Sequence, residues 1–253
     1  MTVHRLDIAY DGSGFHGYAR QVGLRTVQGD LEAALGTLLK TGVETTVAGR
    51  TDAGVHARHQ VVSFAHEGVV DMASFVKSLQ GLVGPQISVQ AMATAPDDFS
   101  ARFSATSRRY RYRIDMRRAH DPLTRGFVWH VGRPLDIAAM AEAAAALLGE
   151  HDFTSFCRSV EGRSNVRRLT MLDMEESEGL LDVWAEANAF CHQMVRSLVG
   201  YLYDVGRGFF DGTQVGGVLA ARDRSTVATV APPHGLTLWE VGYGTRTEGA
   251  GLR

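Results

Sequence analysis

The first hundred residues carry hydrophobic patterns of two periods, and the order of these patterns limits the fold more than any other feature. Strands repeat their apolar residues every second position, whereas helices repeat them at intervals of three and four. In chain order the segments are residues 3–10 (strand), 26–39 (helix), 43–47 (strand), 60–65 (strand), 71–80 (helix) and 87–93 (strand). The order βαββαβ predicts the split-βαβ or ferredoxin-like arrangement.

The remaining residues repeat this order loosely. Strand patterns occupy residues 108–114, 126–131, 169–175, 180–188 and 236–243, and helical patterns occupy residues 135–148, 190–205 and 213–221. We therefore predict an α+β protein of two ferredoxin-like halves, each an antiparallel sheet with helices on one face. The expected domains are residues 1–105, with Asp52 in a loop, and residues 106–253, with Tyr110 and Arg196.

Several classes of protein are disfavoured by composition. The two cysteines, Cys157 and Cys191, form neither a disulfide scaffold nor a CxxC metal motif. Polar residues interrupt the first apolar run, and no run approaches the roughly 18 apolar residues of a membrane span. Residues 12–17 fit GxGxxG, but a long loop separates them from the next helix, so we expect a glycine-rich turn. We expect a cytoplasmic protein without metal, cofactor or membrane partner.

Arginine is concentrated in one part of the chain although the net charge is only -2. Seven arginines lie between residues 102 and 118, where the only acid is Asp115. Because side chains alternate along a strand, Tyr110 and Tyr112 should share one face of residues 108–113. The opposite face should then carry Arg109, Arg111 and Arg113. We favour an RNA-binding face here, and the alternative is an edge strand protected by its charges.

The most distinctive motif is AGRTDAGVHA at residues 48–57, between two expected strands. Glycines on both sides of Asp52 permit tight bends or the close approach of another chain. Such a loop can present a carboxylate at the end of a sheet. Composition alone leaves open a polar turn in which Asp52 bonds to its own backbone.

Further motifs accompany this one in a fixed order. They are YDGSGFHG at residues 10–17, TVQG at 26–29, ARFSAT at 101–106 with RRYRY at 108–112, HDFTSF at 151–156 and MVRSLVG at 194–200. Together they resemble the tRNA pseudouridine synthase A family, which modifies uridines 38 to 40 of the tRNA anticodon stem-loop. The resemblance runs from about residue 4 to residue 243. It departs at residues 17–21, which read GYARQ where the family more usually has Gly-Trp-Gln.

The resemblance implies a pseudouridine synthase-like fold, a cofactor-independent isomerase, a tRNA substrate and a homodimer. It also implies roles for individual residues. Asp52 would be the catalytic carboxylate, which either attacks the ribose C1′ or removes a ribose proton. Tyr110 would stack on the target base and help remove its C5 proton, and Arg196 would pair with Asp52. Arg50 would enter the RNA and help to hold the nucleotide out of the stack.

The residue types suit this chemistry. A carboxylate in a dry pocket keeps its charge only if a cation lies nearby, and a guanidinium supplies that cation. In the expected helix 190–205, Arg196 lies off the apolar face, with His192 and Gly200 at four-residue spacing. Gly200 would leave this surface clear for a close neighbour, whereas a solvated arginine is the alternative. His151 and His192 are expected to serve packing or RNA contact.

Two other functions stay open at this point. A non-catalytic RNA-binding module would show arginines and aromatic residues on a sheet, but Asp52 in a glycine-framed loop speaks against pure binding. A carboxylate-dependent hydrolase acting on RNA or a nucleoside would release a base. An isomerase would leave the mass of the RNA unchanged.

Overall fold

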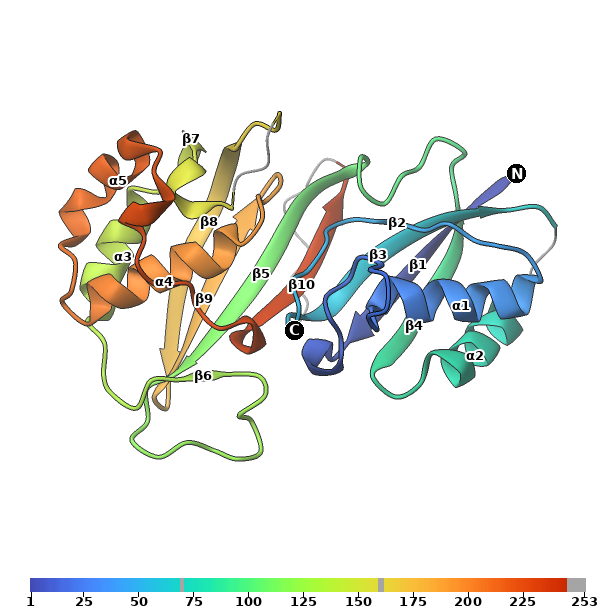
Figure 1. Cartoon of the computed structure of the whole chain (residues 1–253), viewed down its shortest axis with the longest axis horizontal. Helices are drawn as coiled ribbons and strands as arrows, with labels where there is room; N and C mark the ends of the chain where they lie inside the picture. Colours follow the sequence, from blue (N-terminus) through green and yellow to red (C-terminus); the bar gives the residue numbers. More distant parts are fainter. Residues whose placement is uncertain (69–70, 159–161, 245–253) are drawn as a thin grey trace.

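The computed structural model describes residues 1–68, 71–158 and 162–244. In these ranges ten strands form one sheet that crosses the whole molecule (Figure 1). The strand order is β4-β1-β3-β10-β5-β9-β8-β7, with β2 paired to β3 and β6 paired to β5. No helix in the described ranges combines the length and the apolar run that crossing a bilayer requires.

The N-terminal half begins with a strand and contains two helices. Its elements are β1 (Thr2–Tyr10), α1 (Val27–Leu39), β2 (Thr46–Val47), β3 (His56–His66), α2 (Met72–Val83) and β4 (Ile87–Ala95). The expected cap of α1 is confirmed, because the Thr26 hydroxyl accepts a hydrogen bond from Gly29 N at 3.2 Å. Strands β4, β1, β3 and β2 are antiparallel neighbours in that order.

The C-terminal half contains six strands and three α-helices within the described ranges. Its elements are β5 (Ala105–Asp115), β6 (Trp129–His130), α3 (Ile137–Ala145), β7 (Gly149–Asp152), β8 (Val166–Ser177), β9 (Leu180–Ala187), α4 (Met194–Gly206), α5 (Val215–Ala221) and β10 (Leu236–Tyr243). The short strand β7 was not predicted. Helix α4 begins at Met194 rather than at the expected Phe190, because Gln193 is left-handed (φ 64°) and interrupts the helix.

Strand β10 joins the two halves into one sheet. It pairs in parallel with β3 through Thr237 opposite His56 and Leu238 opposite Ala57. It also pairs antiparallel with β5, where Leu238 lies opposite Tyr110. The mixed α+β class is confirmed, but the expectation of two separate sheets is wrong because β10 bonds to both. The ferredoxin-like nature of each half and the division at residue 105 stay predictions.

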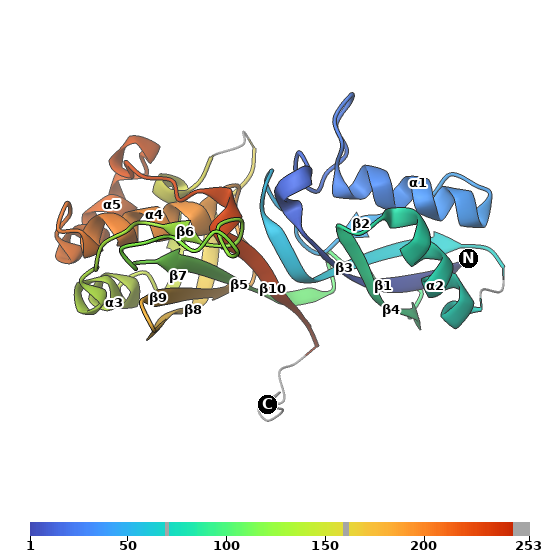
Figure 2. The ribbon, with the colours of Figure 1, turned by 90° about the horizontal axis from the view of Figure 1, so that it is seen from below.

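The helices and the core lie on one side of this sheet. Figure 2 shows α1 of the first half and α4 of the second half above the same face. Alternate residues of β1, beginning at His4, are buried on this face, and so are Tyr110 and Tyr112 of β5. The predicted sharing of one face by these two tyrosines is confirmed.

The arginines of β5 are paired with acids on the neighbouring strands. Arg113 bonds to Asp182 at 2.6 Å, and Arg109 bonds to Glu186 at 2.7 Å. Both acids stand directly opposite these arginines on β9. Arg111 lies over the Trp239 ring, 4.2 Å from its centroid. The alternative of an edge strand is wrong, because β5 lies between β10 and β9. The register of β9 neutralises much of the charge of this strand, and RNA binding at this face stays a prediction.

His4 makes the stability of the N-terminal half depend on pH. It is 2% exposed, its ring lies 5.3 Å from that of Phe64, and neither ring nitrogen has a hydrogen-bond partner among the described residues. Burial, followed by the nearby His66, lowers the pKa of His4. The unfolded chain therefore takes up this proton more readily, and stability should fall as the pH drops below about 6.5.

We predict that His4→Phe will reduce this loss of stability. Phenylalanine fills similar space and leaves no unpaired nitrogen in the core, so its stability at pH 7 should equal or exceed that of the wild type. Thermal unfolding of both proteins between pH 7.5 and about pH 5 measures the effect. An identical drop in Tm on acidification in both proteins would contradict the assignment to His4.

Candidate active site

The loop between β2 and β3 is fixed to the rest of the molecule through its backbone. Asp52 O accepts from Val55 N at 3.1 Å, which closes a turn, and Thr51 O accepts from Tyr18 N at 3.0 Å. The buried Arg108 donates to Ala48 O from Nη2 at 2.8 Å and from Nε at 3.1 Å. These bonds hold both ends of the loop, so the direction of the Asp52 side chain is set by the scaffold.

A buried network of hydrogen bonds supports the loop that carries Asp52. Tyr10 Oη and Thr51 Oγ1 share a hydrogen bond of 2.8 Å, and Gln60 Nε2 donates to Tyr10 Oη at 3.3 Å and to Gly49 O at 2.7 Å. Burial raises the pKa of Tyr10 to about 12, although its two hydrogen bonds oppose this. Its phenol is therefore neutral at physiological pH and acts as a structural support.

His56 of the same motif ties three loops together. Its Nδ1 accepts from Gly12 N at 3.1 Å, and its Nε2 lies 3.0 Å from Gly126 O and 3.2 Å from His234 O. Nδ1 also lies 3.1 Å from Asp11 Oδ1. Burial lowers the pKa of His56, although Asp11 and the two carbonyls oppose this. The sequence analysis gave His56 no role, and only its place in the motif was a signal.

Asp52 and Arg196 meet although 144 residues separate them. Arg196 Nη1 donates to Asp52 Oδ2 at 3.0 Å, while Arg196 Nε donates to Ala231 O at 2.8 Å. The arginine side chain is 14% exposed and the aspartate side chain 24% exposed. This pairing places a largely buried cation behind a carboxylate that still reaches the surface.

Tyr110 lies in the wall of the same site. Its side chain is 7% exposed, and the ring of Phe190 packs edge-on against it with centroids 5.2 Å apart. Burial, and then the neighbouring Tyr10 and Asp52, raises the pKa of Tyr110 above its usual range. The hydroxyl is therefore neutral at physiological pH.

His192, which the sequence led us to expect in packing or RNA contact, lies beside Asp52 instead of only packing. Its Nε2 lies 3.3 Å from Asp52 Oδ1, and its side chain is 42% exposed. Its four-residue spacing from Arg196 was a signal, although His192 precedes α4 and is not part of it. Arg50 is exposed and forms no side-chain hydrogen bond or ion pair within the described ranges, so it is not drawn into this cluster.

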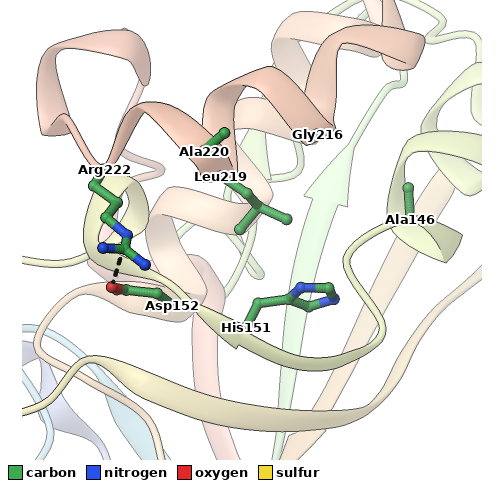
Figure 3. Close-up of a pocket in the computed structure, with 7 residues that line it drawn as sticks. All are labelled: Ala146, His151, Asp152, Gly216, Leu219, Ala220 and Arg222. Atoms are coloured by element: carbon green, nitrogen blue, oxygen red, sulfur yellow. Dashed lines mark ion pairs between the residues drawn. The ribbon is translucent and has the colours of Figure 1, made fainter.

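A separate cavity of about 570 Å³ lies between α3, β7 and α5 (Figure 3). It contains none of the residues around Asp52. Its polar side chains already have partners within the protein. Arg222 pairs with Asp152 at 3.1 Å, and the His151 ring forms a hydrogen bond with Leu148 O. The chemistry of the molecule is therefore better sought at Asp52.

Comparison with known proteins shows the family of the chain. The family model described as tRNA pseudouridine synthase matches residues 143–244. A tRNA pseudouridine synthase A of Frankia casuarinae is 48% identical over 94% of this chain and 88% of its own length. The chain belongs to the tRNA pseudouridine synthase A family. The proteins of that name from Streptomyces griseus and Listeria monocytogenes are 45% and 42% identical, over 94% and 96% of this chain and 87% and 100% of their own lengths.

Membership of the tRNA pseudouridine synthase A family confirms the resemblance seen in the motifs. Uridine and pseudouridine contain the same atoms, so a pseudouridine synthase is an isomerase, and the chain is an enzyme of this class. This finding disfavours the binding-only and hydrolase alternatives. A solved structure described as a Cbf5-Nop10-Gar1 complex has a TM-score of 0.36 and 11% identity, over 79% of this chain and 54% of that chain, and this weak likeness supports no conclusion.

The prediction that Gly200 leaves room for a neighbour is confirmed. A Cβ at this position of α4 would lie 2.0 Å from Thr229 O, so residues 229–231 touch the helix directly. In the same segment, Ala231 O accepts the hydrogen bond from Arg196 Nε. We predict that Gly200→Ala displaces this segment, costs about 1–3 kcal/mol of stability and reduces pseudouridine formation.

Denaturant unfolding and a pseudouridine assay check this prediction. Gly217→Ala in α5 is the matched control, because a Cβ there meets nothing within 4 Å. The control should be neutral or slightly stabilising, since alanine favours a helix more than glycine does. Equal stability and activity of Gly200→Ala and the wild type would contradict the close contact.

Proposed function

We propose that this protein converts uridine to pseudouridine at positions 38 to 40 of the tRNA anticodon stem-loop, with Asp52 as the catalytic carboxylate. The observation that carries the proposal is the position of Asp52. Its carboxylate is partly exposed at the end of a fixed loop, with the Arg196 guanidinium 3.0 Å away. Family membership supplies the tRNA substrate, and the exposed position of Asp52 gives a nucleotide access.

The proposed reaction replaces the N1–C1′ bond between uracil and ribose with a C5–C1′ bond, and the mass of the RNA does not change. In one route an Asp52 oxygen attacks C1′, and the electron pair of the N1–C1′ bond leaves with the uracil. In the other route Asp52 removes a ribose proton and the same bond breaks. The uracil then turns so that C5 faces C1′. The C5–C1′ bond forms as the bond between Asp52 and C1′ breaks in the first route, or as Asp52 returns the proton to the ribose in the second. In both routes N1 gains a proton as C5 loses one. Both routes need an ionised carboxylate, which Arg196 stabilises.

The other residues have supporting roles in the proposal. Tyr110 is close enough to Asp52 for the charge of this carboxylate to act on its hydroxyl, so it would contact the target base beside the carboxylate. Its neutral hydroxyl favours base contact over proton removal by an ionised tyrosine. Arg50, exposed on the loop that carries Asp52, would enter the RNA and keep the nucleotide out of its stack.

We also propose that each half is a ferredoxin-like unit that acts in the cytoplasm. The strand orders β4-β1-β3-β2 and β10-β5-β9-β8 support this fold assignment, because each places the last strand of its half beside the first. A cytoplasmic location would give the enzyme access to tRNA.

Replacing Asp52 tests the proposed chemistry. We predict that the wild type forms pseudouridine in unmodified tRNA, whereas Asp52→Ala and Asp52→Asn lose at least about 10³-fold of the single-turnover rate, because neither can attack C1′ or take a proton. The Asp52→Asn variant keeps the size of the side chain and removes its negative charge, so it isolates the effect of that charge. Mass-spectrometric mapping of the tRNA locates the product.

The controls separate chemistry from binding. Asp97→Asn, at another exposed aspartate, should retain wild-type activity, and both Asp52 variants should bind tRNA as the wild type does. Product from Asp52→Asn at the wild-type rate would exclude Asp52 as the catalytic carboxylate. Product outside positions 38 to 40 would contradict the proposed target.

We also propose a homodimer, which the resemblance to the family implies. We predict that light scattering at micromolar protein concentration gives twice the monomer mass of 27.5 kDa. One anticodon stem-loop would then contact both subunits. A mass of 27.5 kDa across this concentration range, together with full activity, would contradict the dimer.

A further inference from the structure

We propose that His192 is a positioning residue that fixes the orientation of the Asp52 carboxylate. The inference rests on the proposed function, in which one oxygen of Asp52 must point at the ribose. The His192 imidazole lies 3.3 Å from Oδ1, the oxygen that Arg196 does not bind. The two residues therefore contact different ends of the same carboxylate.

A single hydrogen bond from Arg196 leaves the Asp52 carboxylate free to rotate about its Cβ–Cγ bond. Arg196 uses Nη1 for Oδ2 and commits Nε to Ala231 O, so the guanidinium does not grip both carboxylate oxygens. With Oδ2 held, Oδ1 can still change its position by rotation about the Cβ–Cγ bond. A second polar group at Oδ1 would fix this rotation, and among the side chains of the described ranges only His192 forms an ion pair with that oxygen.

The backbone around His192 is held on both sides. His192 O accepts from Arg158 N at 3.0 Å, and Cys191 O accepts from Met194 N at 3.1 Å. Next in the chain, Gln193 is left-handed, and its carbonyl accepts from both the amide and the hydroxyl of Ser197. A non-glycine residue keeps this conformation only where its surroundings enforce it. These contacts direct the imidazole toward Asp52.

His192 also lies on the open side of the carboxylate. Its side chain is 42% exposed, compared with 14% for Arg196. Oδ2 is therefore held from the protein side, and Oδ1 faces the side from which a nucleotide arrives. This geometry assigns Oδ1 as the oxygen that acts on the ribose and His192 as the group that aims it. Small errors in such aiming reduce rates strongly.

Three substitutions of His192 test the role. In His192→Gln the amide nitrogen reaches about as far as imidazole Nε2, whereas in His192→Asn it reaches only as far as Nδ1. We expect His192→Ala and His192→Asn to lower the single-turnover rate about 10- to 100-fold, with tRNA affinity within about twofold of the wild type. His192→Gln should recover most of the rate. His120→Ala, at an exposed histidine outside the site, should match the wild type.

The other outcomes are distinct. Loss of tRNA affinity without loss of the single-turnover rate would make His192 an RNA contact and overturn the inference. Equal rates for the Gln and Asn variants would overturn the role of a donor at Nε2, and so would a wild-type rate for His192→Ala. Absence of pseudouridine with the wild-type enzyme itself would instead reject the proposed function. Thermal melting of each variant verifies that it is folded.

Discussion

The pairing of β10 with two strands is the constraint on which the candidate site depends. Leu238 lies opposite Ala57 on β3 and opposite Tyr110 on β5. The loop that carries Asp52 ends directly before β3, so this shared register sets the loop beside Tyr110. It also places the N-terminal half next to α4, where Arg196 completes the carboxylate site. Backbone hydrogen bonds thus determine the distances between side chains that come from both halves.

Charge is distributed differently on the two sides of the sheet. On the side without helices, Arg109 and Arg113 face acids of β9 and are largely neutralised. On the helix side, Arg196 meets a single carboxylate in a partly buried setting, where electrostatic interaction is stronger than in water. The number of arginines in a segment is therefore a poor guide to its function. Whether the charge of an arginine is available to a ligand depends on its partners on the neighbouring strands.

Local signals in the sequence were enough to predict most elements, whereas Asp52, Tyr110 and Arg196 were singled out by the resemblance of their motifs to a family. Periodicity located the helices, and the glycines around Asp52 indicated an exposed loop. The register between distant strands could not be predicted, because it depends on contacts that local patterns do not contain. For this reason the β10 junction and the acids opposite the arginines were missed. The position of His192 beside Asp52 was not predicted, because Gln193 places His192 before the start of α4 and outside the expected helix.

The position of β10 in the chain has a consequence for biosynthesis. Asp52 is made early, but the strand that sets its loop beside Tyr110 spans Leu236–Tyr243. During translation the N-terminal strands can pair while this place in the sheet is still empty. Contacts between residues so far apart in sequence form slowly, because a long loop must close first. A ribosome-bound chain that lacks β10 should therefore hold the Asp52 loop without the strand that fixes it beside Tyr110, and the candidate site should assemble only after Leu236–Tyr243 have been made.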